Sequence, residues 1–299
     1  MKICIASTSN LAIPTLELLL DQGHSISLIT KPRKVSGRGK SEKINAIEKR
    51  AIELGIPVIF HDGDRELARF IENNGFELVI AISYGRLIKE PVLSAPKYGW
   101  LNLHFSCLPA YRGAAPVQRA ILAGETKSGF TIFKLDAGMD TGPVYMCKEF
   151  DISDLNTGEI LTKFAKEGAK EFPAVIEDIA NQVLPSPQSG SFSLAPKISK
   201  EETQIDWSGE AEHIQRHIRA LTPKPGAWSS INGKRIRIEG AHISNGSGIP
   251  GSILEINPLL IACKSGALEI LNVRPEGSRS MTAAEWIRGA RISPGAKFD

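Results

Sequence analysis

The stretch that decides the fold is residues 2–30, KICIASTSNLAIPTLELLLDQGHSISLIT. The apolar run KICIA predicts a short strand, and the polar residues 7–10 that follow predict a turn. Apolar residues then recur at helical spacing over residues 13–20, and Gly23 ends this predicted helix. Residues 24–30 predict a second strand. A strand, a helix and a strand in this order are typical of a parallel sheet.

The same alternation continues along the chain. Helical patterns cover residues 44–54 and 65–73, and apolar strand patterns cover residues 56–60 and 78–83. We therefore expect an α/β fold with a doubly wound, mostly parallel sheet. The turn after the first strand lacks the pattern GxGxxG, so a dinucleotide site is not indicated.

The composition changes after residue 183. Residues 184–200, LPSPQSGSFSLAPKISK, are rich in proline and serine, which is typical of a linker. An amphipathic helix at residues 210–221 follows, and then short β-like runs separated by turn residues. Such runs predict a small β-barrel of the oligonucleotide-binding type. We expect a catalytic domain at 1–183, a linker at 184–204 and a barrel at 205–299.

Composition narrows the class of protein. The sequence contains no apolar run long enough to span a membrane, and its polar start does not resemble a secretory signal. Its four cysteines form no CxxC pair, so neither a zinc site nor a disulfide framework is indicated. We expect a cytoplasmic monomer. The segment 31–50 holds eight Lys or Arg and two Glu, which indicates either a solvated loop or a surface for a polyanion.

The candidate catalytic residues lie between residues 99 and 143. Alternation along the predicted strand 100–105 places Asn102 and His104 on one face. A second predicted strand, 131–135, leads to a loop that carries Asp140. An amide, an imidazole and a carboxylate at neighbouring strand ends form a plausible acid–base set. The alternatives are a buried structural histidine and a turn in which the aspartate caps its own backbone.

Three motifs in this region carry a resemblance to a known family. They are Asn102-Leu-His104, Ser106-x-Leu108-Pro109-x-x-Arg112-Gly113 and Asp136-x-Gly-x-Asp140-Thr-Gly142. Together they resemble the formyltransferases that use 10-formyltetrahydrofolate. The run from Arg112 to Arg119, the loop 37–40, the segment 197–207 and the tail 284–291 resemble the methionyl-tRNA branch of that family. The likeness spans nearly the whole chain.

The resemblance implies transfer of a formyl group to the amino group of methionyl-initiator tRNA, without a metal. Asn102 and His104 would stabilise the oxyanion, and Asp140 would hold the imidazolium or relay the proton of the amine. The residues expected to bind the folate are Tyr84, Gly85, Leu87, Ser106, Cys107, Leu108, Pro109, Gly138 and Thr141. The residues expected to bind tRNA are Arg38, Lys40, Lys43 and Lys200.

One stretch departs from the family. Relatives have a Gly-Thr-Pro-Asp-Phe loop after the first strand, where this chain has Ser7-Thr8-Ser9-Asn10-Leu11. That loop shapes the acceptor pocket, so the donor is better defined than the acceptor. The competing interpretations are a sugar-amine N-formyltransferase, a hydrolase that releases formate from the same carrier, and a non-catalytic RNA-binding module.

Overall fold

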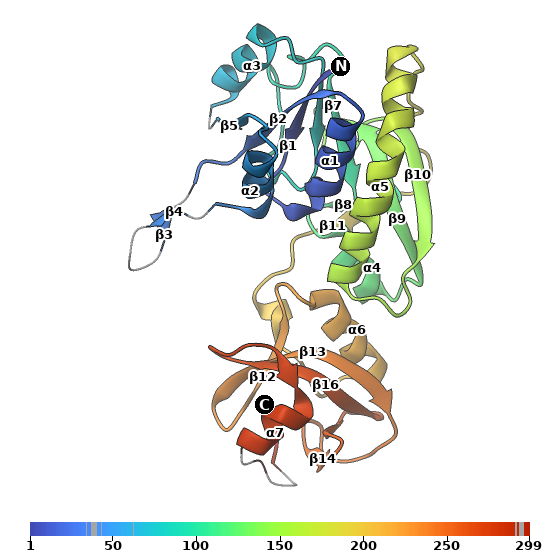
Figure 1. Ribbon diagram of the computed structural model, residues 1–299. Coiled ribbons are helices and arrows are strands. Elements are labelled where there is room, and N and C mark those ends of the chain that lie inside the picture. Colours follow the sequence, from blue (N-terminus) through green and yellow to red (C-terminus); the bar gives the residue numbers. More distant parts are fainter. Residues whose placement is uncertain (34, 37–40, 43, 62, 291, 293–295) are drawn as a thin grey trace. The chain divides into compact units, whose positions relative to one another are not determined.

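The computed structural model describes residues 1–299 except 34, 37–40, 43, 62, 291 and 293–295 (Figure 1). The chain forms two compact units. The first contains residues 1–116, 128–150 and 161–195, and the second contains residues 117–127, 151–160 and 196–299. Both units are therefore assembled from separated segments of the chain. None of the described helices is long and apolar enough to cross a membrane.

The first unit contains a sheet of seven strands in the order β10-β9-β7-β6-β1-β2-β5. The strands β5 (Val58–Phe60), β2 (Ser25–Thr30), β1 (Lys2–Ala6), β6 (Leu78–Ala81) and β7 (Trp100–His104) run parallel. The strand β9 (Lys127–Lys134) pairs antiparallel with β7, and β10 (Val144–Asp151) forms the edge. This confirms the predicted α/β fold with a mostly parallel sheet.

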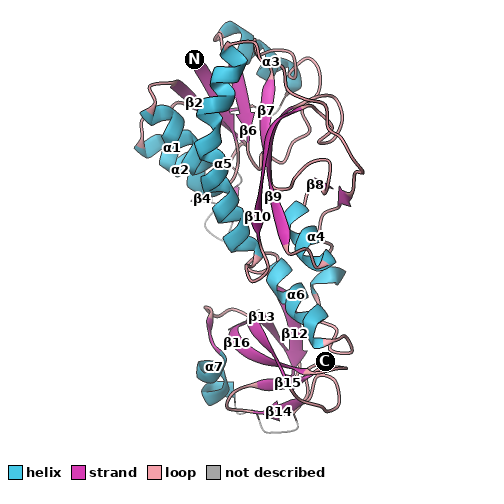
Figure 2. Ribbon diagram, turned by 90° about the vertical axis from the view of Figure 1, so that its right-hand side faces the viewer, coloured by secondary structure: helices cyan, strands magenta, loops and turns pink. Residues whose placement is uncertain are grey.

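Helices cover both faces of this sheet because its strands are apolar on both sides. The helix α3 (Asp64–Asn73) packs with Cys4, Ala6 and Val79 on one face. The helices α1 (Ile13–Asp21), α2 (Ala46–Glu53) and α5 (Thr157–Ala180) lie together on one side in Figure 2. Gly168 of α5 lies against Leu103, and a Cβ at this glycine would be 2.6 Å from the leucine side chain. No helix was expected from the sequence at the position of α5.

The segment predicted as a linker is not a free connection. Its residues up to Ala195 belong to the first unit, where β11 (Leu194–Ala195) pairs with β8 (Arg112–Gly113). The residues from Pro196 onward belong to the second unit and include the short helix η2 (Glu201–Thr203). Proline and serine gave this segment the composition of a linker. The backbone of Ser186 nevertheless pairs with Val144, and the Ser193 hydroxyl accepts from Tyr111 N–H, within the first unit.

The second unit is built on an antiparallel sheet. The strands β12 (Ala227–Ile231), β13 (Lys234–Ser244), β16 (Ala267–Pro275), β15 (Leu260–Ala262) and β14 (Ile253–Glu255) lie in that order, and β17 (Met281–Thr282) pairs with β16. Near the end of the chain, Phe298 bridges to Ile231, and Lys297 bridges to Ser252. Residues 297 and 298 thus connect the two edges of the sheet, because Ile231 belongs to β12 and Ser252 directly precedes β14. The predicted barrel requires such a connection.

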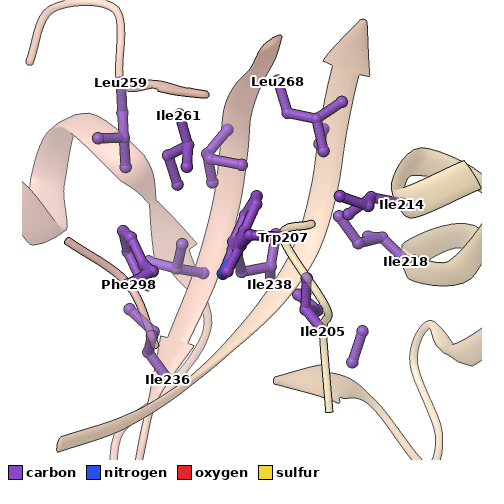
Figure 3. Close-up of a cluster of buried hydrophobic side chains, with 14 of the residues drawn as sticks. Ile205, Trp207, Ile214, Ile218, Ile236, Ile238, Leu259, Ile261, Leu268 and Phe298 are labelled. Carbon is purple, nitrogen blue, oxygen red and sulfur yellow. The ribbon is translucent and has the colours of Figure 1, made fainter. Parts of the chain in front are cut away.

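The core of the second unit gathers around Trp207 (Figure 3). The ring of Phe298 lies 5.7 Å from the ring of Trp207, and the indole nitrogen of Trp207 donates to Ser229 Oγ. The helix α6 (Ala211–Leu221) adds Ile214 and Ile218 to the same cluster. The helix α7 (Ala283–Ala290) adds partly buried apolar side chains.

Candidate active site

A cavity of about 550 Å³ opens beyond the carboxyl ends of β6 and β7. Ligands of open α/β sheets bind at this edge, where strand ends and loops converge. The volume lies within the range of about 300 to 1,000 Å³ that small-molecule sites have. The cavity lies entirely within the first unit.

Asn102 and His104 both line this cavity, since alternate residues of β7 share one face. His104 is only 6% exposed. Asn102 is half-buried, and its side-chain amide has no hydrogen-bond partner among the residues that the structure describes. The amide is therefore available to a ligand in the cavity.

A backbone carbonyl holds one ring nitrogen of the His104 imidazole. Its Nε2 lies 3.0 Å from the carbonyl oxygen of Tyr111, and a carbonyl only accepts, so Nε2 carries the proton. Its Nδ1 then faces Asp140 Oδ2 at 3.7 Å. Burial lowers the pKa of His104, although the Asp140 charge and the Tyr111 carbonyl oppose that shift. The favoured form is thus a neutral imidazole whose Nδ1 lone pair is free to accept a proton.

The loop that carries Asp140 is fixed by its own hydrogen bonds. Asp136 Oδ1 accepts from the backbone N–H of Gly138 at 3.0 Å and from the Thr141 hydroxyl at 2.6 Å. A Cβ at Gly138 would lie 2.0 Å from Thr141 Oγ1, so any side chain here would displace the hydroxyl that donates to Asp136. Asp140 itself has a φ of 56°, and its Oδ2 accepts from the backbone N–H of Gly113 at 2.8 Å. The loop therefore presents one carboxylate oxygen to both Gly113 and the imidazole.

The nine residues predicted to bind folate divide into two groups. Four of them line the cavity: Tyr84, Gly85, Leu87 and Gly138. Leu87 is 53% exposed and Met139 is 57% exposed, although both are large apolar side chains at the cavity. Exposed apolar side chains beside a cavity are typical of a ligand-binding surface.

The other five residues are not among those that line the cavity: Ser106, Cys107, Leu108, Pro109 and Thr141. Four of them form the turn after β7, which Thr131 holds by donating to the Ser106 carbonyl at 2.7 Å and accepting from Leu108 N–H at 3.0 Å. The Cys107 thiol points to the Lys148 carbonyl instead, at 3.9 Å. Contact between this group and a folate stays a prediction.

Three residues absent from the prediction help to build the site. The Tyr111 carbonyl holds His104, and the Gly113 N–H holds Asp140. Gln188 donates from Nε2 to the carbonyls of Asp140 and Gly142, at 2.8 Å each. The first two belong to the motif after β7, but no local pattern in the proline-rich segment around Gln188 indicates a role at the site.

The structure describes one of the four residues predicted to bind tRNA. Arg38, Lys40 and Lys43 fall outside the described residues; β3 (Val35–Ser36) and β4 (Ser41–Glu42), which pair antiparallel, belong to the same segment. Lys200 is exposed and directly precedes η2.

The second unit also carries an arginine cluster, which we define as Arg235, Arg237 and Arg274. These residues line a cavity of about 200 Å³. The guanidinium of Arg235 stacks 4.0 Å from the Trp228 ring, and Arg274 pairs with Glu239 at 3.2 Å. Within the described part of the chain, no three His, Cys, Asp or Glu side chains gather as metal ligands would.

Comparison with known proteins identifies the family of the chain. A family profile described as formyl transferase matches residues 1–176, and one described as formyl transferase, C-terminal domain, matches residues 197–291. The methionyl-tRNA formyltransferase of Acidothermus cellulolyticus is 36% identical to this chain and covers 100% of both sequences. The protein of the same name from Cereibacter sphaeroides is 37% identical over 99% of this chain and 98% of its own length.

A solved structure has the same fold. The crystal structure of HypX from Aquifex aeolicus in complex with tetrahydrofolic acid superposes with a TM-score of 0.71 at 21% identity. The match covers 96% of this chain and 47% of that one. With two matching domains and full-length relatives, the chain belongs to the formyl transferase family, in the branch of the methionyl-tRNA formyltransferases.

Proposed function

We propose that this protein transfers the formyl group of 10-formyltetrahydrofolate to the α-amino group of methionyl-initiator tRNA, in the cytoplasm and as a monomer. The observation that carries the proposal is the convergence of Asn102, His104 and Asp140 on one cavity. Relatives named methionyl-tRNA formyltransferase, matched over their full length, support the choice of acceptor.

The site contains the groups that such a transfer needs. The bound folate supplies an activated formyl amide, whose carbon the amine attacks. As the new N–C bond forms, the C=O electrons move onto oxygen, and the Asn102 amide donates to that oxyanion. Donors of this kind are worth a factor of about 10² to 10³ in rate. His104 Nδ1 takes the proton from the attacking nitrogen, and the Asp140 carboxylate stabilises the imidazolium that results.

This assignment refines the roles expected from the sequence. Burial keeps His104 neutral before the reaction, so the histidine first acts as a base. It becomes a cation only when it has accepted the proton of the amine. It can then return that proton to the folate nitrogen as the old N–C bond breaks, which completes the transfer.

The cavity suits a flat aromatic donor. Gly85 has a φ of 67° and offers backbone without a side chain, while Leu87 and Met139 provide exposed apolar surface. The HypX structure that shares this fold holds tetrahydrofolic acid, which supports a folate in this chain as well. Tyr84, Gly85, Leu87 and Gly138 are the residues we assign to the donor.

The acceptor is assigned to basic residues. Arg38, Lys40, Lys43 and Lys200 remain the residues that we propose for tRNA contact. The arginine cluster adds guanidinium groups, which bind phosphates in bidentate fashion, and Trp228 adds a ring on which a base can stack.

One assay tests the proposal against the sugar alternative. The protein is incubated with 10-formyltetrahydrofolate and either methionyl-initiator tRNA or a nucleotide-linked amino sugar, and formylated product is measured. We expect formylated product only in the incubation with methionyl-initiator tRNA. Product with the sugar alone would refute the acceptor, and release of free formate without either acceptor would identify a hydrolase.

A further inference from the structure

Gln188 joins the two segments that hold the catalytic pair. Its Nε2 donates to the carbonyl oxygens of Asp140 and Gly142. Its Oε1 accepts from Arg112, at 3.2 Å from Nε and 2.6 Å from Nη2. One amide group thus contacts the loop that carries Asp140 and the strand β8 that follows the His104 turn.

The backbone around Gln188 is anchored on both sides. Ser186 exchanges two backbone hydrogen bonds with Val144, at 2.7 and 2.9 Å. On the other side, Ser193 accepts at its hydroxyl from Tyr111 N–H and at its carbonyl from Arg112 N–H. Gln188 is therefore attached at one end to the strand after the Asp140 loop and at the other to the residue that holds His104.

The backbone of Asp140 needs external support. Its φ of 56° lies in the left-handed region, which non-glycine residues occupy only rarely, although aspartate does so more readily than most. The Gly113 N–H holds its carboxylate, and Gln188 holds its carbonyl and that of Gly142. Because the carbonyl and the side chain are both fixed, the distance from Asp140 Oδ2 to His104 Nδ1 is fixed as well.

We infer that Gln188 is a positioning residue for the transfer: its amide holds the Asp140 loop so that the carboxylate faces the imidazole. The inference rests on the proposed function. Gln188 contacts neither the cavity nor the reacting atoms, so its effect passes through Asp140. Arg112, whose guanidinium lies 5.4 Å from the Phe192 ring, in turn orients the Gln188 amide so that its NH₂ group faces the two carbonyls.

The variant Gln188→Glu separates positioning from folding. A glutamate keeps the shape of the side chain and its pairing with Arg112, but an ionised carboxylate cannot donate to the two carbonyls. At pH 8 we expect kcat to fall at least about 10-fold, the KM for 10-formyltetrahydrofolate to stay within twofold, and the protein to remain folded with a modestly lower Tm, because two hydrogen bonds are lost. The matched control is Gln204→Glu, which adds the same charge at an exposed position in the second unit and should leave kcat unchanged.

A double-mutant cycle with Asp140→Asn gives the decisive result. If Gln188 acts through Asp140, Gln188→Glu should lower kcat far less in the Asp140→Asn enzyme than in the parent. Full additivity of the two losses, or a Gln188→Glu enzyme with the kcat of the parent, would overturn the inference. A large fall in Tm together with a loss of folate binding equal to the loss in kcat would overturn it too, because Gln188 would then have a structural role. A parent enzyme that formylates no charged tRNA would instead refute the proposed function.

Discussion

The charge of Asp140 is expected to control both the rate and the pH dependence of the transfer. The substitution Asp140→Asn keeps the size of the side chain and leaves an oxygen to accept from the Gly113 N–H. It removes the negative charge that lies 3.7 Å from His104 Nδ1. When the histidine accepts the proton of the amine, the resulting imidazolium then has no counter-charge.

The size of the effect follows from that distance. At 3.7 Å, and with an effective dielectric constant of about 20, Coulomb's law gives roughly 4 kcal/mol for the imidazolium and the carboxylate. The carboxylate is 16% exposed and already accepts from Gly113, and both features weaken its field. We therefore expect a loss of about 3 to 4 kcal/mol, which corresponds to about 10² to 10³ in rate.

The sign of the pH effect is also fixed. Burial lowers the pKa of His104 and the Asp140 charge raises it, so removal of the charge should lower this pKa further. The rate falls on the acid side where His104 becomes protonated, so the midpoint of this limb should move to lower pH in Asp140→Asn. Single-turnover formylation at saturating substrates, measured across pH, tests both statements. A variant within threefold of the parent, or a midpoint that moves to higher pH, would refute this account of the pair.

Four further outcomes are expected. The substitution His104→Ala should lower single-turnover formylation by about 10² or more in a folded protein, as measured with a circular-dichroism check on the fold. Alkylation of Cys147 should have its midpoint below that of an ordinary thiol, because the neighbouring Cys107 side chain lowers the Cys147 pKa, and Cys107→Ala should move the midpoint to higher pH. Arg38→Ala should weaken the use of charged tRNA while the folate dissociation constant, measured by calorimetry, stays the same; equal use by both proteins would remove Arg38 from the tRNA site. Phe298→Ala should destabilise the second unit by about 3 to 5 kcal/mol in denaturant unfolding, because this ring is buried in its core.

The periodicity of the sequence was enough to predict most of the fold. The strand–helix–strand pattern of residues 2–30 appears at nearly the expected positions, and the expected short strands follow residue 226. Helix α5 was missed although it has 24 residues. Gly168 and Pro173 interrupt its helical pattern, and both residues disfavour a helix in isolation. The packing of Gly168 against Leu103 explains the glycine, but only the folded structure shows that contact.

The candidate site was predictable where side-chain direction follows from a strand. Alternation along β7 places Asn102 and His104 on one face, and both line the cavity. Beyond the strand, the motif shows only which residues are neighbours in the sequence. That neighbourhood does not determine where each side chain points. Cys107 belongs to the same motif but points to Lys148. Gln188 lies 48 residues from Asp140 in the sequence, and no local pattern reports a hydrogen bond over that separation.

Each of the two units is made of three separate segments of the sequence, and this limits how such a protein can be divided or recombined. The family profile for the C-terminal domain covers residues 197–291, yet the second unit also includes residues 117–127 and 151–160. Arg219 donates to the carbonyls of Ile152 and Leu155, and Thr157 donates to that of Ala220. A gene fragment cut at the profile boundary would encode a barrel without the segments that satisfy these groups. Exchange of the second unit between relatives would therefore have to carry three separate pieces of coding sequence, which favours inheritance of the chain as a single block.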